Sequence, residues 1–224
     1  MRNESHVSSS ILCGVLCLAT CALATGILFA PIAVQAQSTS LPATRIYLGA
    51  IFTVDSHAGP WLPSLNPAYD YGFHDNSNPT IVNEANSGIR FTPGTVLTIT
   101  YMSGLVSAGG SLPFTDANGD TTSPYGCGPG LTDPPNGKLL PCDYGDLSKK
   151  TYLMALMGVF ADSNGVIVGQ PFTIGDGPYQ VAIPAGATQL QMGVTDDIYY
   201  DNMGSFAIQV THYGSTACSL NGRP

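Results

Sequence analysis

Three aspartates and an asparagine lie close together near the C-terminal end of the chain: Asp196, Asp197, Asp201 and Asn202. Carboxylates crowded into one short loop repel one another unless protons or a cation offset their charge. Carboxylate and amide oxygens are also the ligands that calcium prefers in proteins. Residues 195–202, called the acidic loop from here on, are therefore compatible with a calcium site and equally with a solvated acidic turn.

The segments on either side of the acidic loop alternate apolar and polar residues. The apolar positions are Leu190, Met192, Val194, Phe206, Ile208 and Val210. A period of two predicts half-buried β-strands, because successive side chains of a strand point to opposite faces. Two strands are therefore expected to position the loop.

Other segments rich in β-branched and aromatic residues predict further strands, separated by turns that contain glycine, proline, asparagine or aspartate. They span residues 45–54, 96–102, 152–160, 166–168, 172–174, 179–183 and 189–194. About eight or nine short strands and no clear helical pattern predict an all-β sandwich or barrel.

The N-terminal region has the features of an export signal. Residues 11–32 are almost continuously apolar, and the small-residue pattern Val34-Gln35-Ala36 follows them. This predicts a signal peptide over residues 1–36 and a secreted, extracellular or periplasmic mature protein. The apolar run is also long enough for an uncleaved membrane anchor, which is the alternative.

The charge balance argues against two classes of partner. The chain has 15 acidic against 7 basic residues, with a formal net charge of -8, and its basic residues do not cluster. Nucleic acids and anionic membrane surfaces attract basic patches, so we expect neither as a partner. Glu84 is the only glutamate after the predicted signal, and the other acids are aspartates, which are typical of turns and calcium loops.

Export permits disulfide bonds, and three cysteines remain after the predicted signal. Cys127 and Cys142 enclose a loop rich in glycine and proline that needs a cross-link, so we predict that they pair. Cys218 is then left as a free thiol or as half of an intermolecular bridge.

A long polar loop over residues 57–78 contains the single tryptophan, Trp61, and several tyrosines. Aromatic rings on such a loop could stack on sugar rings. The interpretation we favour is that Trp61 and Leu62 fix the loop to the hydrophobic core.

The order of several motifs resembles the PA-I galactophilic lectin (LecA-like) family over residues 90–212. The matching segments are residues 91–99, which begin Phe91-Thr92-Pro93-Gly94-Thr95, the apolar run 153–160, Pro171-Phe172-Thr173-Ile174-Gly175, Ile183-Pro184-Ala185-Gly186-Ala187, and Asp196-Asp197 with Asp201-Asn202-Met203-Gly204-Ser205-Phe206. The last segment resembles the final hairpin of that family. The resemblance implies a jelly-roll-like β-sandwich of the galactose-binding-domain type.

The resemblance also implies a calcium ion held by one aspartate, two asparagine-type side chains and two main-chain carbonyls. Carried over to this chain, Asp196 is the first carboxylate, and Asp201 and Asn202 are the paired side chains. The carbonyls would come from Ile198 and Ala108. The loop is about two residues shorter than that of the galactose-binding prototype, and Asp201 stands where the family has asparagine.

Sugar recognition in the family further uses a histidine and a glutamine ahead of a cysteine-containing loop. By local order, Asp133 occupies the histidine position and Asn136 the glutamine position. The implied sugar-binding set is therefore Asp133, Asn136, Asp196, Asp201 and Asn202. The expected partner is a carbohydrate, a galactoside or another glycan.

Three functions follow from these patterns. The first is a secreted calcium-dependent carbohydrate-binding domain, for which a homo-oligomer would supply avidity. The second is a calcium-stabilised extracellular structural module that binds no sugar. The third and least favoured is a polysaccharide hydrolase, since no Gly-x-Ser-x-Gly, His-Glu-x-x-His, P-loop or zinc motif is found. We therefore expect a non-enzyme.

The expected organisation places one folded domain after the signal. Residues 37–90 contribute a strand and the long loop to this domain, residues 91–213 form its lectin-like core, and residues 214–224 form a tail.

Overall fold

The computed structural model describes residues 45–215, with side chains from 49 to 212. The predicted signal peptide and Cys218 lie outside the described residues, and so does most of the predicted tail. No helix in the described part is long and apolar enough to cross a membrane.

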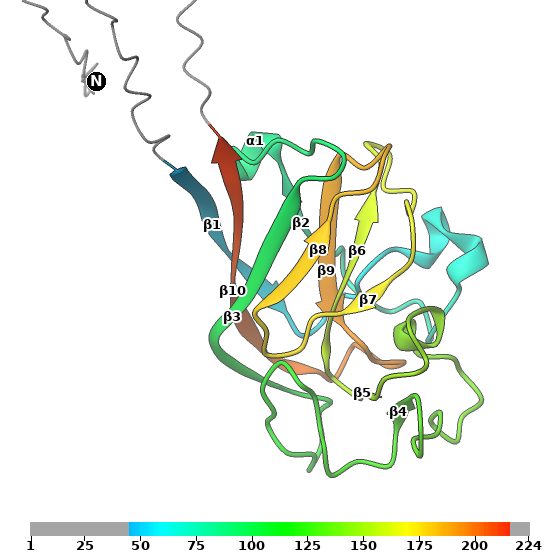
Figure 1. The fold of residues 1–224 in the computed structure, drawn as a ribbon. Helices are drawn as coiled ribbons and strands as arrows, with labels where there is room; N and C mark the ends of the chain where they lie inside the picture. The colour runs from blue at the N-terminus through cyan, green and yellow to red at the C-terminus, as the bar shows by residue number, and fades with distance from the viewer. Residues whose placement is uncertain (1–44, 216–224) are drawn as a thin grey trace, which may run out of the picture. The chain divides into compact units, whose positions relative to one another are not determined.

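The first of two four-stranded antiparallel sheets has the order β1-β10-β3-β8 (Figure 1). Its strands are β1 (Arg45–Asp55), β3 (Val96–Ser107), β8 (Tyr179–Ala182) and β10 (Met203–Ser215). β10 pairs with the whole of β1 on one side and with β3 on the other, where the register shifts at Ala207/Ile208. The longest strands of the protein therefore lie side by side, and β10 leads directly away from the acidic loop.

The second sheet has the order β2-β9-β6-β7. Its strands are β2 (Thr80–Asn83), β6 (Leu156–Ala161), β7 (Phe172–Thr173) and β9 (Gln189–Val194). A separate two-stranded sheet joins β4 (Gly126–Cys127) to β5 (Thr151–Tyr152). The helical elements are α1 (Glu84–Ser87) and short 3-10 turns at Pro63–Leu65, Pro67–Tyr69 and Pro141–Tyr144.

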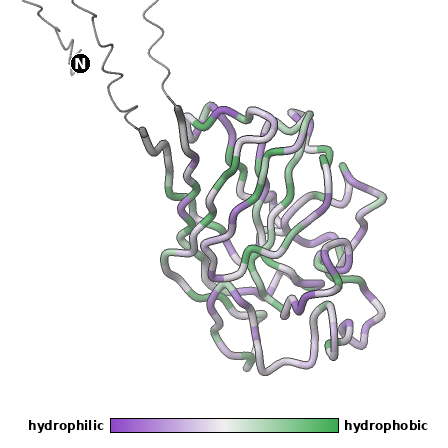
Figure 2. The backbone as a smooth tube through the Cα atoms, in the orientation of Figure 1, coloured by the Kyte–Doolittle hydropathy of each residue, from purple (hydrophilic) through white to green (hydrophobic). Residues whose placement is uncertain are grey.

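Alternating apolar side chains from the two large sheets meet in one buried cluster. Leu190, Met192 and Val194 of β9 contribute to it together with Phe206 and Ile208 of β10. Figure 2 shows hydrophobic residues gathered along the strands, with polar residues more frequent in the loops. The all-β prediction is confirmed, and the arrangement is β-sandwich-like, with ten strands in the described residues where eight or nine were expected.

The prediction that the acidic loop closes a hairpin is wrong. β9 pairs with β2 and β6, whereas β10 pairs with β1 and β3 in the other sheet. The loop therefore crosses from one sheet to the other, and alternation alone could not reveal this because it is the same in both arrangements.

The prediction of one continuous strand over residues 152–160 is also wrong. A turn separates β5 from β6, and Met154 has a φ of 66°. Its amide donates to Thr195 O at 2.8 Å, so this turn forms part of the support beneath the acidic loop. The apolar run reflects burial of both the turn and the strand.

The long loop is fixed to the core, as the favoured interpretation predicted. Trp61 is fully buried, and its Nε1 donates to Tyr69 O at 2.8 Å. Tyr71 is buried against it, with ring centroids 5.2 Å apart. Trp61 is therefore a structural anchor and is not available for stacking on a ligand.

Candidate functional site

The acidic loop is largely buried. Asp196 is 3% exposed, Asp197 is 5% exposed and Asn202 is 3% exposed, whereas Asp201 lies at the surface. Three of the loop's four acidic or amide residues are therefore shielded from solvent, which does not fit a solvated acidic turn. Burial of carboxylates is costly unless protons, hydrogen bonds or a cation compensate it.

Asp196 has only one of its two oxygens satisfied. Its Oδ1 accepts from the Asp197 amide at 2.8 Å, and its buried Oδ2 has no hydrogen-bond partner. Burial raises the pKa of this carboxyl to about 8, although the Asp197 amide and the neighbouring Asn202 side chain lower it. A group that stabilises the charged carboxylate would bring its pKa back down.

Asn202 presents a second buried oxygen without a donor. Its Nδ2 donates to Ser56 O at 2.9 Å, while its Oδ1 has no partner. Turning the amide over would place Oδ1 against the Ser56 carbonyl, so the Asn202 oxygen lacks a donor in either orientation. The Asp196 and Asn202 oxygens can be satisfied together by a proton on Asp196 or by a cation near both.

The chain segment after β3 packs against Asp201. A Cβ placed on Gly109 would lie 2.5 Å from Asp201 O and 2.8 Å from its Oδ2, so only glycine fits there. Ala108, whose carbonyl oxygen is a predicted calcium ligand, directly precedes Gly109 in the chain. Ile198 is partly exposed, and its amide lies 3.5 Å from Asp196 Oδ1. Residues predicted from the two distant segments therefore come together.

The described residues hold no group of three or more histidine, cysteine, aspartate or glutamate side chains that could bind a metal. A cation at the acidic loop would consequently depend on amide and main-chain oxygens as well as on carboxylates. Calcium accepts such a mixed set of oxygen ligands, whereas zinc prefers nitrogen and sulfur.

Of the two residues predicted from the Pro-rich loop, Asn136 contacts the acidic loop and Asp133 lies near Asp143 instead. Asn136 Nδ2 donates to Asp197 Oδ2, which attaches the Pro-rich loop to the acidic loop. Asp133 lies against Asp143, whose pKa is raised to about 6 by burial and by the charge of Asp133. Asn136 thus borders the predicted site through Asp197, a residue that the predicted ligand set does not include.

The Asp133–Asp143 pair also bears on the hydrolase alternative. Glycoside hydrolases place two carboxyl groups on opposite sides of the scissile bond, roughly 5–9.5 Å apart. Asp133 is near enough to Asp143 to raise its pKa, and Asp143 Oδ2 accepts from the Leu140 amide at 2.8 Å. The two carboxyl groups therefore lie closer together than the spacing that a glycosidase uses.

The long loop supplies neighbours that the sequence reasoning missed. Asp75 Oδ2 accepts from the amides of Tyr199 and Tyr200 at 3.0 and 3.1 Å. Phe73 donates its amide to Asp197 O at 3.0 Å. More than a hundred residues separate these partners in the chain, and the only available signal was the aspartates of the long loop.

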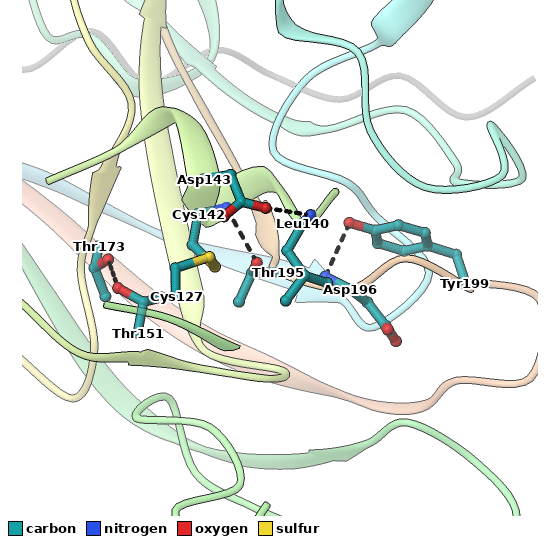
Figure 3. The surroundings of a disulfide bond; sticks show 9 residues. All are labelled: Cys127, Leu140, Cys142, Asp143, Thr151, Thr173, Thr195, Asp196 and Tyr199. Carbon is teal, nitrogen blue, oxygen red and sulfur yellow. Dashed lines mark hydrogen bonds between the residues drawn. A yellow bond between two sulfur atoms is a disulfide. The ribbon is translucent and has the colours of Figure 1, made fainter. Parts of the chain in front are cut away.

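The predicted disulfide between Cys127 and Cys142 is confirmed, with their Cα atoms 5.8 Å apart. The Cys142 amide donates to Thr195 Oγ1 at 3.3 Å, as Figure 3 shows. In the same view, the Asp196 amide donates to the hydroxyl of Tyr199. The disulfide therefore braces the start of the acidic loop.

Comparison of this chain with protein-family models, with curated proteins and with solved structures finds no match. The fold and the acidic loop are therefore the basis for proposing a function.

Proposed function

We propose that this protein is a secreted calcium-dependent carbohydrate-binding protein of the lectin type with a jelly-roll-like sandwich, in which the acidic loop holds the ion. The observation that carries the proposal is the pair of buried, unpartnered oxygens on Asp196 and Asn202. Both are hard oxygen donors of the kind that calcium takes. The resemblance to PA-I galactophilic lectins selects the same two residues.

In this proposal Asp196 and Asn202 hold the ion from the buried side, and Asp201 holds it from the exposed side. Carbonyl oxygens of Ile198 and Ala108 complete the protein's ligand set. Calcium, when bound, supplies coordination positions that neighbouring sugar hydroxyls can occupy. Asp201 is at the surface, so its carboxylate can also accept a hydrogen bond from a sugar hydroxyl.

A polar hollow next to the acidic loop offers room for the sugar. It has a volume of about 200 Å³ and is lined by Asp70, Tyr71, Gly72, Gly137, Lys138 and Leu139. Asn136, which is bonded to Asp197, is next to Gly137 in the chain. The hollow supports a shallow, hydrated site of modest affinity, for which several copies of the protein would supply avidity.

The second candidate is a calcium-stabilised extracellular module without sugar binding. The burial of Asp196 and Asn202 favours it, because an ion between them would have much of its surface covered by protein. Calcium would then stabilise the acidic loop where the chain passes from one sheet to the other.

The test compares Asp201→Ala with Asp176→Ala, a matched change at another exposed aspartate. Calcium affinity is measured by titration calorimetry on the EDTA-stripped proteins. We expect Asp201→Ala to weaken calcium binding at least about tenfold and Asp176→Ala to leave it unchanged, as a lost charged ligand requires. Equal affinities for the two variants would show that the ligand assignment is wrong.

A glycan array then separates the two candidates. The lectin proposal predicts binding, with galactosides as the first candidates, in calcium and its loss in EDTA. Calcium binding with no glycan bound would support the structural module.

A further inference from the structure

A second concave site lies away from the acidic loop, between the long loop, β9 and the turn that follows β6. The open pocket has a volume of about 240 Å³. Its lining is Leu62, Leu65, Asn78, Pro79, Ile81, Ser163, Asn164, Gly165, Gln189 and Gln191. This set is called the amide pocket from here on, because four of its side chains are carboxamides and none is ionisable.

Gln191 is the central observation at this pocket. The residue is 3% exposed, and its Oε1 is buried without a hydrogen-bond partner. Leu190 and Met192 point into the core, so Gln191 points to the opposite face of β9, where the pocket lies. A buried acceptor without a donor is costly, and a turn of the carboxamide towards the pocket would let a ligand hydroxyl satisfy it.

The walls of the amide pocket are held together by one buried residue, Asn66. Its Nδ2 donates to Leu62 O at 3.2 Å and to Gly165 O at 3.1 Å, and its Oδ1 accepts from the Ile167 amide at 2.9 Å. Asn66 thereby joins the long loop to the turn after β6. A pocket with fixed walls loses less entropy when a ligand binds.

Gln189 is a second lining side chain that is held in place. Gln189 Nε2 donates to Asp162 O at 2.6 Å. The Asp162 carboxylate is occupied within its own turn, where it accepts from the amides of Asn164 and Val166 at 2.8 and 3.0 Å. The pocket therefore presents an oriented amide at Gln189, and the nearby Asp162 carboxylate is engaged by its own turn and does not line the pocket.

From this geometry we infer that the amide pocket binds one neutral monosaccharide unit, independently of calcium. Carboxamides offer both donors and acceptors, which neighbouring sugar hydroxyls need. Leu62, Leu65 and Ile81 provide apolar surface for the C–H face of a sugar ring. The lack of an ionisable lining residue disfavours charged ligands, and the volume is below the usual range for larger ligands, which favours a single ring.

This inference does not rest on the calcium site, because no residue of the acidic loop lines the pocket. The two sites can therefore be tested separately on the same full chain. All measurements on the amide pocket are made in EDTA, where the proposed calcium site is inactive.

The experiment is ligand-observed NMR with methyl glycosides of galactose, glucose, mannose and N-acetylglucosamine, with glucuronic acid and sialic acid as charged comparators. We expect at least one neutral glycoside to bind in EDTA with a Kd of about 1 mM and the charged sugars to bind at least about tenfold more weakly. Binding of free glutamine or acetamide in place of the neutral sugars would overturn the assignment of the ligand class. The absence of any binding would overturn the inference itself.

Two variants locate the binding. Gln191→Leu removes the buried acceptor and should weaken sugar binding about tenfold, whereas Gln180→Leu changes an exposed glutamine on β8 and should have no effect. Ser163→Tyr alters an exposed lining residue and should block the pocket without disturbing the core. Unchanged binding in both Gln191→Leu and Ser163→Tyr would show that the sugar binds elsewhere.

Discussion

The acidic loop and the amide pocket are built on the same strand and bordered by the same long loop, yet they bury different kinds of polar group. Gln191 lies within β9, and Asp196 follows that strand by two residues. Each has a buried oxygen without a partner. The Gln191 oxygen is neutral and needs only a hydrogen-bond donor, whereas the Asp196 oxygen belongs to a group that can carry a charge.

This difference indicates which change in conditions each region should respond to. A buried carboxyl is stabilised by a proton or a cation, so the acidic loop should respond to calcium and pH. A buried carboxamide does not titrate, so the amide pocket should respond only to neutral ligands. Two perturbations separate the two regions, and a third tests the carboxyl pair beside the disulfide; they are given in order of decreasing expected effect.

The largest expected effect comes from removing the disulfide with Cys127→Ser and Cys142→Ser together. The bond closes a loop with a sequence separation of 15, so its loss should reduce the free energy of unfolding by about 3 kcal/mol. Chemical denaturation measures this change. Because Cys142 contacts Thr195, calcium affinity should fall while sugar binding in the amide pocket is retained.

The corresponding control is the same pair of titrations on the wild-type protein. An unchanged calcium affinity in the folded double variant would show that the disulfide does not support the acidic loop. Loss of both binding activities in a folded variant would show that the two regions are not independent.

A smaller effect on stability, restricted to the amide pocket, is expected for Asn66→Ala. The change leaves the Ile167 amide and the Leu62 and Gly165 carbonyls without this partner, which should cost about 1–3 kcal/mol. Thermal and denaturant unfolding measure the loss, with Gln180→Ala, a change at an exposed carboxamide outside the pocket, as the control. A calcium affinity that fell as much as sugar binding would contradict the separation of the two regions.

The smallest effect concerns the Asp133–Asp143 pair and depends on pH. The pKa of Asp143 is raised from 3.8 to about 6, so between these pH values the folded state holds more protons than the unfolded state. Stability contributed by the protonated pair is therefore present below pH 4 and is lost as the pH rises towards 6. Asp143→Asn should remove this pair's share of the dependence, while the share due to the raised pKa of Asp196 remains, and should leave the protein more stable than wild type at pH 7.

Unfolding free energies at pH 4 and pH 7 check this prediction, with the exposed Asp176→Asn as the control. If Asp143→Asn kept the wild-type loss of stability between these pH values, another group would have to account for it.

The parts of the fold that depend on local pattern could be predicted from the sequence. Alternation predicted the strands on both sides of the acidic loop, and the glycine- and proline-rich segment between Cys127 and Cys142 predicted their disulfide. Burial of Trp61 was also predicted, because a lone large aromatic residue on a polar loop commonly anchors it.

The parts that depend on long-range pairing could not be predicted. Period-two alternation is the same whether β9 pairs with β10 or with β6, so the crossing between sheets was missed. The apolar run at residues 152–160 concealed a turn, since buried turns and buried strands have similar compositions. Asp75 and Gln191 acquire their roles only when segments more than a hundred residues apart are packed together.

The most direct test of the central proposal is to titrate calcium into the EDTA-stripped protein and to measure the melting temperature at each concentration. The titration is done on the wild type and on Asp196→Asn. Asparagine keeps an oxygen to accept from the Asp197 amide but cannot carry the charge. Calcium at a hundredfold excess over its Kd should stabilise the wild type by about 2.7 kcal/mol, with magnesium much less effective and Asp196→Asn unresponsive. No shift of the wild type up to millimolar calcium would show that a proton, not a cation, satisfies the acidic loop, and would contradict the proposal.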